Sequence, residues 1–396
     1  MEREKHVNIT RAVTATVCIM TLLLTGCASM QGTKAKKYFS NLYRRIPYRQ
    51  EGPHRVIKIF YATSRAVVDK PDADLEFLPK MGENLTGGVL DVKIDPSLKI
   101  GKMLPKRFER TGEIGLANIE KVDIDVLANN VREAIDKSPH KSLLVLVFGF
   151  KDDFHSIAIE AAYYSYMLDV NTPILLFDWP GDQPVSIRGY NRAKENAKAS
   201  GVFFGKVMAA VAKELQPGDK IWIQASSLGC QVVCSGFEYM YKHPALADPQ
   251  EEIDHVFLAA PDISEDEFNE SFKKEIAALS KNVTAYVSFN DNALLMSSML
   301  NGNQRLGRQT VKGVAKKELR KETKNMLYLK SLHPDKVSLV DVTPINKASY
   351  GHGYYLEDPQ YFDDVYLRMF LTSSHRNRRL YLVEYKDGTD YWVLKK

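Results

Sequence analysis

The sequence has few cysteines, no long apolar run and no large excess of charge, and each scarcity narrows the possible classes of protein. Only four cysteines occur in 396 residues, and none stands in a spacing typical of a zinc site. The uncharged, mostly apolar run from Ala12 to Leu24 is shorter than the ~20 residues that a transmembrane helix needs. A net charge of +5 does not indicate a nucleic-acid partner.

The composition is that of an ordinary globular protein. Apolar residues make up 44% of the chain and charged residues 26%, which is sufficient for a full hydrophobic core. A chain of 396 residues forms about one large domain or two ordinary ones.

The N-terminus resembles a bacterial lipoprotein signal. Arg3, Lys5 and Arg11 precede the apolar run, which ends in the lipobox-like sequence Leu24-Thr25-Gly26-Cys27. This resemblance implies a signal peptide over residues 1–26, cleavage before Cys27 and acylation of its thiol, with palmitate among the acyl groups. We therefore expect a lipid-anchored protein of the bacterial cell envelope, at the outer membrane if the cell is Gram-negative. The alternative is an ordinary secretory signal in which Cys27 has no role.

Residues 27–54 are interpreted as a basic tether. The stretch contains a single acid, Glu51, against the basic residues Lys34, Lys36, Lys37, Arg44, Arg45 and Arg49. Such charges either lie against anionic lipid headgroups or serve only solubility. Beyond the tether, Cys230 and Cys234 are expected to be small buried apolar groups rather than a disulfide or a metal pair.

From residue 55 to about 370 the sequence alternates between strand-like and helix-like segments. The predicted strands are apolar runs at 56–61, 88–94, 143–148, 174–177, 221–223, 255–258, 284–287 and 337–341, and the predicted helices cover 125–137, 153–168, 186–215 and 228–242. Buried strands that alternate with helices predict an α/β domain, with a mostly parallel central sheet and helices on both faces. In such sheets the ligand site lies beyond the carboxyl ends of the strands.

Two parts depart from this alternation. Residues 301–332 are rich in lysine and arginine and are interpreted as a partly helical basic insertion, either a solvated helix face or a contact with a membrane or an acidic partner. Residues 371–396 contain two alternating runs around Asp387-Gly388, which predicts a C-terminal β-hairpin extension.

The sequence Ala225-Ser226-Ser227-Leu228-Gly229 lies between a predicted strand and a predicted helix. Strand, small-x-Ser-x-Gly and helix together describe a nucleophile elbow, a turn so tight that only small residues fit beside the serine. We therefore predict Ser227 as the nucleophile, and the backbone N–H of Leu228 as one donor of an oxyanion hole.

Candidates for the acid and then for the base follow Ser227 along the chain, which is the order typical of α/β-hydrolases. His352 stands between two glycines in a predicted flexible loop, and Asp291 comes just past a strand end. The preferred assignment is His352 as base and Asp291 as acid. Asp262 follows the preceding strand and is the alternative acid, or a brace for the loop that carries His352.

The second oxyanion donor is expected in the loop after the first central strand. There Gly149 lets the backbone approach closely, and the N–H of Phe150 or of Lys151 can face the oxyanion. Trp179 and Tyr190 are candidate walls of an acyl pocket, with core packing as the alternative for Trp179.

Several of these motifs together resemble a bacterial family of α/β-hydrolases of largely unknown function. The matching segments run in the family's order and are Phe60–Arg65, Phe148–Phe150, Phe177–Gly181, Ala225–Gly229, Leu258–Asp262, Tyr286–Leu294 and Gly351–Tyr354. The resemblance implies the α/β-hydrolase fold with Ser227, Asp291 and His352 at the triad positions. The chain departs from the family's pattern at Phe148 and Ser226, where family members usually have histidine.

The expected function is that of a lipid-anchored serine hydrolase, an esterase or lipase-like enzyme that cleaves acyl bonds of small molecules or lipids through an acyl-enzyme. No cofactor, metal or nucleic acid is expected, and nothing in the sequence indicates the oligomeric state. The alternative is an inactive α/β-hydrolase scaffold that acts as a binding or assembly lipoprotein in the envelope, which the departures at Phe148 and Ser226 favour.

Overall fold

The computed structural model describes residues 46–69, 75–98, 112–244, 253–308, 329–333, 337–370, 380–384 and 390–394. The chain from Ile46 to Lys396 forms a compact unit of its own. The predicted signal peptide, Cys27 and most of the predicted tether lie outside the described residues.

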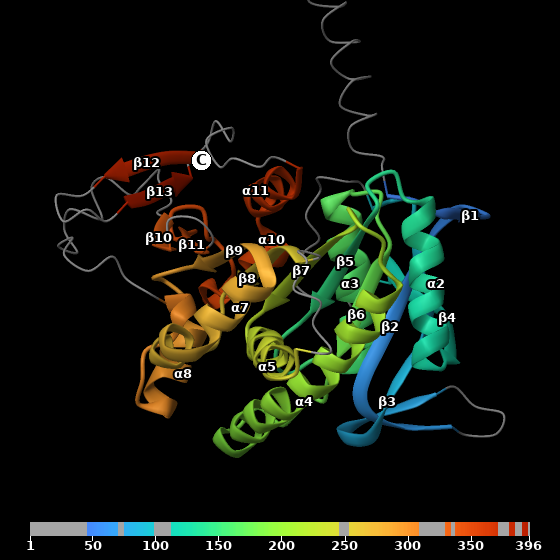
Figure 1. The fold of residues 1–396 in the computed structure, drawn as a ribbon, viewed down its shortest axis with the longest axis horizontal. Coiled ribbons are helices and arrows are strands. Elements are labelled where there is room, and N and C mark those ends of the chain that lie inside the picture. The colour runs from blue at the N-terminus through green and yellow to red at the C-terminus, as the bar shows by residue number, and fades with distance from the viewer. Residues whose placement is uncertain are drawn as a thin grey trace, which may run out of the picture. The chain divides into compact units, whose positions relative to one another are not determined.

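The core of the fold is a mixed sheet with a parallel centre (Figure 1). Its parallel strands, in spatial order, are β11 (Val337–Asp341), β9 (Ser280–Val287), β8 (Ile253–Ala259), β7 (Lys220–Ser226), β5 (Ser142–Val147), β6 (Ile174–Asp178) and β2 (His54–Val68). Antiparallel strands extend both edges: β3 (Glu76–Ile94), β4 (Ile114–Val122) and β1 (Arg49–Glu51) beyond β2, and β10 (Leu329–His333), β13 (Asp390–Leu394) and β12 (Leu380–Glu384) beyond β11.

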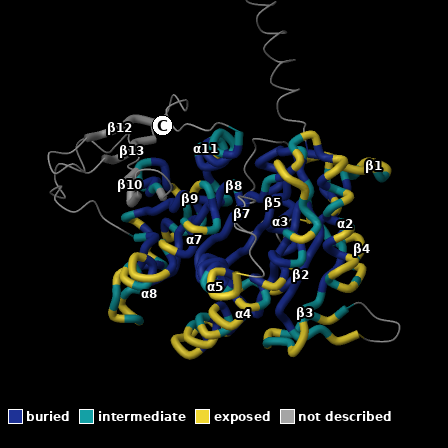
Figure 2. Tube along the Cα trace, in the orientation of Figure 1, coloured by how far each residue is buried: buried dark blue, intermediate teal, exposed yellow. Residues whose placement is uncertain are grey.

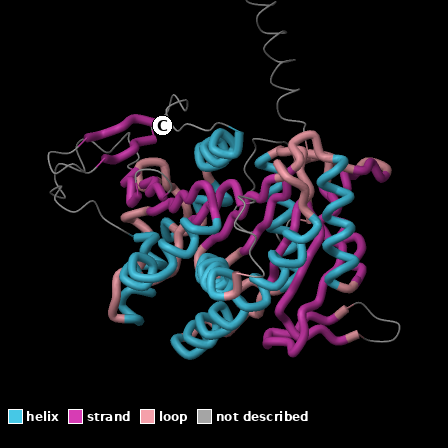
Figure 3. Tube along the Cα trace, in the orientation of Figure 1, coloured by secondary structure: helices cyan, strands magenta, loops and turns pink. Residues whose placement is uncertain are grey.

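Helices cover both faces of this sheet (Figures 1 and 3). The helices α2 (Ile124–Lys137), α4 (Ile187–Glu214), α5 (Gly229–Lys242) and α7 (Lys273–Leu279) pack over one face, and α3 (Phe154–Leu168), α10 (Tyr354–Glu357) and α11 (Pro359–Phe370) over the other. The helix α8 (Asn292–Asn301) and the short helices α6 (Glu265–Glu267), η2 (Phe268–Phe272), η3 (Leu306–Arg308) and η5 (Ser349–Gly351) complete the described helical segments.

The apolar runs of the sequence become strands that are buried on both sides. In β7, Ile221 and Ile223 belong to the core on the α5 side, whereas Trp222 belongs to the core on the α3 side. This alternation follows from the two-residue period of a strand, so a strand between two helical layers must be apolar at every position. Buried residues therefore fill the centre of the molecule (Figure 2), and the predicted α/β-hydrolase architecture is confirmed.

The predicted tether ends earlier than the sequence indicates. Ile46 is only 3% exposed, and its N–H donates to Asp169 Oδ1 at 3.1 Å. Residues 49–51 form β1, which pairs with β2. Residues 46–54 thus belong to the folded unit, because Ile46 contributes to the core and β1 extends the sheet.

The C-terminal hairpin is present, and the segment predicted as an insertion is partly integrated into the fold. Strands β12 and β13 pair antiparallel, and β13 continues the sheet beside β10. Within the predicted insertion, Arg305 is fully buried rather than part of a solvated face, because it pairs with Asp262 at 3.0 Å. Residues 309–328 lie outside the described residues.

Cys230 and Cys234 are free and buried, as the sequence predicts.

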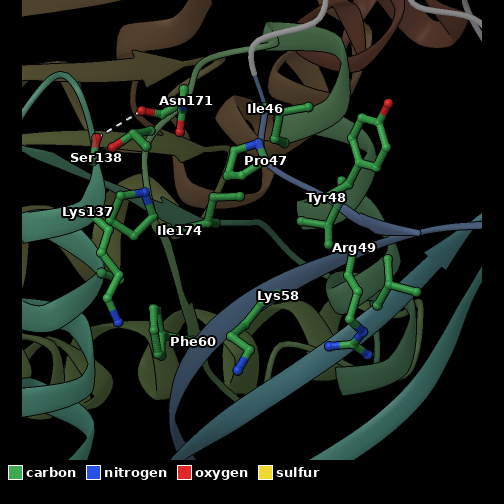
Figure 4. A pocket seen from close by; sticks show the side chains of 15 residues that line it. Ile46, Pro47, Tyr48, Arg49, Lys58, Phe60, Lys137, Ser138, Asn171 and Ile174 are labelled. Atoms are coloured by element: carbon green, nitrogen blue, oxygen red, sulfur yellow. Dashed lines mark hydrogen bonds between the residues drawn. The ribbon is translucent and has the colours of Figure 1, made fainter. Parts of the chain in front are cut away.

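A cavity of about 360 Å³ lies at the amino ends of the central strands (Figure 4). It is lined by residues that precede or begin β2 and β6 and by the end of α2, among them Ile46, Lys58, Lys137 and Ile174. This is the end of the sheet opposite to the one at which Ser227 follows β7.

Among the helices that the structure describes, none combines the length and the apolar character that crossing a bilayer requires.

Candidate active site

Ser227 occupies a strained turn between β7 and α5. Its φ of 51° lies in the left-handed region, which residues other than glycine rarely adopt. Close backbone approach explains the two neighbouring glycines. A Cβ at Gly149 would lie 2.6 Å from Ser227 Cβ, and a Cβ at Gly229 would lie 2.4 Å from the carbonyl oxygen of Phe148. The predicted elbow geometry is therefore present at Ser227.

The structure brings Ser227, His352 and Asp291 together from three distant parts of the chain. His352 Nε2 lies 3.0 Å from Ser227 Oγ, and His352 Nδ1 lies 2.7 Å from Asp291 Oδ2. A neutral imidazole with its proton on Nδ1 donates to Asp291 and accepts from the serine hydroxyl. This is the arrangement in which a histidine can deprotonate a serine while a carboxylate orients it.

Asp291 is fully buried and also begins α8. Its Oδ1 accepts the backbone N–H of Leu294 at 2.9 Å, which is an N-cap contact. One carboxylate oxygen is thereby held by the helix while the other faces His352. The helix thus determines the direction of the carboxylate.

The alternative acid, Asp262, does not stand behind the imidazole. Its Oδ1 lies 3.0 Å from Arg305 Nε and accepts from Ser297 Oγ at 2.6 Å. Its Oδ2 accepts from the Tyr190 hydroxyl at 3.0 Å. The carboxylate is therefore occupied by a buried polar cluster. The Asp262 backbone N–H donates to the Ser227 carbonyl at 3.2 Å, so Asp262 meets the elbow through its main chain.

The segment that carries His352 is held by its neighbours. Asn346 Nδ2 donates to the carbonyl of Gly351 at 2.6 Å and to Ser288 Oγ at 2.8 Å. Gly351 has a φ of 69°, and a Cβ there would lie 2.3 Å from the Asn290 carbonyl oxygen. The glycine thus permits close packing against the end of β9, and Asn346 is a positioning residue that sequence analysis missed.

The protonation of His352 is set by two opposing effects. Burial of the imidazole disfavours its charged form, but the negative charge of Asp291, the hydrogen bond to it and the smaller effect of the Asp262 charge together outweigh burial. The pKa of His352 is consequently raised above its ordinary value of 6.5. The raised pKa reflects a stronger base, as proton abstraction from a serine requires.

Two backbone N–H groups beside Ser227 are free to bind an oxyanion. Within the described residues, neither the N–H of Phe150 nor that of Leu228 donates to another atom. The N–H of Lys151, by contrast, donates to the Gly181 carbonyl at 2.9 Å. Of the two donors considered in this loop, Lys151 is thus engaged elsewhere and Phe150 remains.

The loop that carries Phe150 is fastened at three points. Trp179 Nε1 donates to the carbonyl of Phe148 at 2.8 Å, and Arg65 Nη2 donates to the carbonyl of Asp152 at 3.2 Å. The third point is the Lys151–Gly181 hydrogen bond. Trp179 is fully buried and belongs to the hydrophobic core on the α5 side of the sheet, which agrees with the alternative of core packing.

Arg65 forms the centre of a buried ionic cluster at the end of β2. Its Nε lies 2.8 Å from Asp178 Oδ2 with both side chains fully buried, and its Nη1 pairs with Asp182. Thr63 Oγ1 donates to the same Asp178 oxygen at 2.6 Å. Arg65 and Asp178 both lie in segments that resemble the family, Phe60–Arg65 and Phe177–Gly181, but the sequence does not show that they pair.

Replacing Arg65 by methionine is expected to reduce the free energy of unfolding by about 3–5 kcal/mol, because the buried carboxylate of Asp178 loses its cation. Urea unfolding followed by circular dichroism measures the change. Arg49→Met is the matched control. Arg49 also pairs with two carboxylates but is 52% exposed, so its loss should leave the free energy of unfolding almost unchanged, because solvent screens an exposed pair. Equal stability of the two variants would contradict the role of the cluster.

Tyr190 stands at the rim of the oxyanion loop. Its ring packs edge-on against Phe150 with the centroids 6.0 Å apart. Burial and the neighbouring charge of Asp262 raise the pKa of Tyr190 to about 12, so the hydroxyl remains a donor. This position is compatible with the predicted pocket wall.

The two departures from the family's pattern lie beneath the surface. Phe148 is 1% exposed and packs into the core near Tyr164, with the ring centroids 6.4 Å apart. Ser226 is fully buried, whereas Ser227 is 7% exposed. Both side chains are thus buried in the folded domain rather than at the surface. Within the described residues, no cluster of three or more His, Cys, Asp or Glu side chains is placed to hold a metal ion.

Comparison with known proteins agrees with this geometry. A family model described as an alpha/beta hydrolase of unknown function (DUF900) matches residues 124–368, which is more than half of the chain. No curated protein matches the sequence. The matched range contains Ser227, Asp291 and His352 but not Arg65.

Proposed function

The chain belongs to this DUF900 family of α/β-hydrolases of unknown function, and from that membership and the geometry at Ser227 we propose that it is a serine hydrolase of carboxylic esters or related acyl bonds. The observation that carries the proposal is the pair of distances at His352, 3.0 Å to Ser227 Oγ and 2.7 Å to Asp291 Oδ2. The left-handed turn at Ser227 and the unengaged N–H groups of Phe150 and Leu228 support it.

The first half of the reaction forms the acyl-enzyme. Ser227 Oγ attacks the carbonyl carbon of the ester while its proton passes to His352 Nε2. The carbonyl oxygen becomes an oxyanion, which accepts from the N–H groups of Phe150 and Leu228, each donor contributing about 3–4 kcal/mol to the stability of the transition state. The intermediate then expels the alcohol, which takes the proton from His352.

The second half restores the enzyme. Water attacks the acyl carbon and gives a proton to His352, and the same two N–H groups bind the second oxyanion. The bond to Ser227 Oγ breaks, the serine regains the proton from His352, and the carboxylic acid leaves. Throughout, Asp291 stabilises the imidazolium and fixes the tautomer. These steps use no metal or cofactor.

Labelling with a fluorophosphonate tests the proposal. The full-length protein should be modified covalently at Ser227, identified by mass spectrometry of the peptide, because an activated serine attacks phosphorus as it attacks a carbonyl. The variant Ser227→Ala should not react, and the neighbouring Ser226→Ala should react as the parent does. A folded protein that never reacts would favour the alternative, an inactive binding or assembly scaffold.

We further propose that the enzyme is anchored to the cell envelope through acylated Cys27. The proposal rests on the lipobox-like sequence Leu24–Cys27 and on the stability of multiple acyl chains in a bilayer, in which each buried CH₂ contributes ~0.8 kcal/mol. A mature protein that keeps an unmodified Cys27 thiol, detected from the mass of its N-terminal peptide, would remove the anchor from the proposal.

A further inference from the structure

The most exposed large apolar side chains cluster on one edge of the molecule. Among the residues whose side-chain exposure the structure describes, five large apolar side chains exceed 60% exposure, and these are Val185, Ile187, Met296, Met299 and Tyr350. The other large apolar side chains in that set are at most 46% exposed. Together with Leu300, which is 45% exposed, the five are called the apolar rim here.

The apolar rim follows the carboxyl ends of three central strands. Val185 and Ile187 come after β6, the two methionines and Leu300 lie on α8 after β9, and Tyr350 comes after β11. This is the edge of the sheet that carries Ser227 after β7. The helix α8 begins at the N-cap residue Asp291, so the exposed methionines stand on the same helix that orients the acid behind His352.

Side-chain contacts hold these segments side by side. The Tyr190 hydroxyl lies 2.8 Å from Ser297 Oγ, and Lys194 Nζ donates to Asn301 Oδ1 at 2.8 Å. These contacts join the first turns of α4, which begins at Ile187, to α8 (Figure 1). The turn η5, which contains Tyr350, also packs against α8. The segments that carry the rim are therefore neighbours, with α8 in contact with both α4 and η5.

The helix α8 presents two distinct faces. Leu294 and Ser297 are buried, whereas Met296, Met299 and Leu300 are exposed. Their spacing of three and four residues places them on one stripe of the helix. An apolar stripe that is left in water beside a reactive site is typical of a surface that binds a partner.

Positive charge accompanies the apolar rim. Arg188 and Arg192 flank the exposed start of α4, and Lys347 precedes Tyr350 by three residues; all three are exposed. No acidic side chain in the described ranges pairs with any of them. The acidic helix α6 contacts α4 further along, where Lys198 pairs with Glu267 at 2.8 Å. Apolar side chains with cations beside them match the chemistry of an anionic lipid surface.

We propose that the apolar rim binds the surface of an anionic lipid layer, so that acyl substrates reach Ser227 from that layer. The part of this inference that concerns substrate delivery rests on the proposed hydrolase function, whereas the binding of lipid does not. Hydrophobic insertion of the methionines and Tyr350, together with contacts from Arg188, Arg192 and Lys347 to headgroups, would place the candidate active site against the lipid. The substrate class that this surface fits is an acyl ester held in a membrane or micelle.

Co-sedimentation with vesicles of phosphatidylglycerol and phosphatidylcholine tests the binding. The protein is the chain from residue 27 onward with Cys27→Ser, which keeps the whole compact unit from Ile46 and lacks the predicted signal and acyl anchor. Met296→Asp/Met299→Asp should bind these vesicles at least about tenfold more weakly, because apolar insertion is lost and like charges are introduced. Arg188→Gln/Arg192→Gln should bind more weakly than the parent by up to about fivefold, because two headgroup contacts are lost.

The matched control is Val126→Asp/Val202→Asp, which makes the same change of charge at exposed valines on α2 and α4 away from the rim. It should bind within about twofold of the parent. Failure of the parent protein to bind the vesicles would overturn the proposal. Equal losses in the two double-aspartate variants would also overturn it, because only net charge would then matter. Ser227→Ala should bind as the parent does. If fluorophosphonate does not label Ser227 while binding still depends on the methionines, the hydrolase proposal fails and the lipid surface stands.

Discussion

The variant His352→Ala is expected to lower kcat for ester hydrolysis by about 10⁴- to 10⁶-fold. Among the described residues, His352 is the side chain that forms a hydrogen bond with Ser227 Oγ, at 3.0 Å. Without it the serine hydroxyl has no acceptor for its proton, and the leaving alcohol has no donor. Turnover of a water-soluble short-chain ester, followed at saturating substrate, measures the loss.

The fold should survive this substitution. The His352 side chain is 21% exposed, and Asp291 keeps its hydrogen bond from the Leu294 N–H. The free energy of unfolding should therefore change by no more than about 1–2 kcal/mol. His243→Ala is the control, since His243 is exposed at the far end of α5, and it should keep full turnover. Near-normal turnover in His352→Ala would exclude this histidine from the mechanism.

The variant Asp291→Asn is expected to lower kcat by about 10⁴-fold. An asparagine at this position can present its amide to His352 Nδ1, which favours the tautomer with the proton on Nε2, the wrong nitrogen for accepting the serine proton. It also removes the negative charge that stabilises the imidazolium. Steady-state kinetics on the same soluble ester measures the effect.

Asp262→Asn is the matched comparison, because it makes the same chemical change in the rival carboxylate. Asp262 pairs with the buried Arg305, so its loss should appear chiefly as lower stability, by about 3–5 kcal/mol, and only secondarily in kcat. If Asp262→Asn loses as much kcat as Asp291→Asn while both proteins remain folded, the assignment of the acid is wrong.

The pH dependence of kcat/KM provides a second readout of Asp291. The reaction needs neutral His352, so kcat/KM should rise as the pH increases through the raised pKa of this residue, above 6.5. Asp291→Asn removes the two largest effects that raise the pKa of His352, the charge and the hydrogen bond of Asp291, while burial, which lowers it, and the smaller raising effect of Asp262 remain. The rise of kcat/KM with pH should thus occur at lower pH in the variant than in the parent. A rise that occurs at the same pH in both proteins would show that a group other than His352 titrates.

Local sequence patterns were sufficient to predict the central architecture. Strands such as β5 and β7 are short apolar runs bounded by turns, and α2 and α5 have clear helical spacing. The elbow at Ser227 is likewise local, since the left-handed turn and the glycine at 229 follow from five consecutive residues. The edge strand β4 was not predicted, because it is half-exposed and its pattern is weak. The helix α11 was not predicted either, although its buried residues Tyr361, Val365 and Met369 have helical spacing.

Other features depend on contacts between distant segments. Asp262 and Asp291 both follow strand ends in the sequence, and nothing local distinguishes the acid from its rival. Arg305 was placed in a solvated insertion by its basic neighbours, yet it is buried because Asp262 is available to pair with it. Trp179 was placed at a pocket wall, but its indole faces the Phe148 carbonyl across 31 positions of sequence.

The amino-acid sequence by itself determined the layered α/β sheet, the position of the reactive serine and the order of the residues that follow it, because hydrophobic periodicity and tight turns are properties of consecutive residues. Only the tertiary structure decided which carboxylate stands behind His352, which backbone N–H groups remain free, and which apolar side chains stay in water around the site. These depend on pairing geometry and desolvation between elements that are far apart along the chain, and no local pattern encodes them.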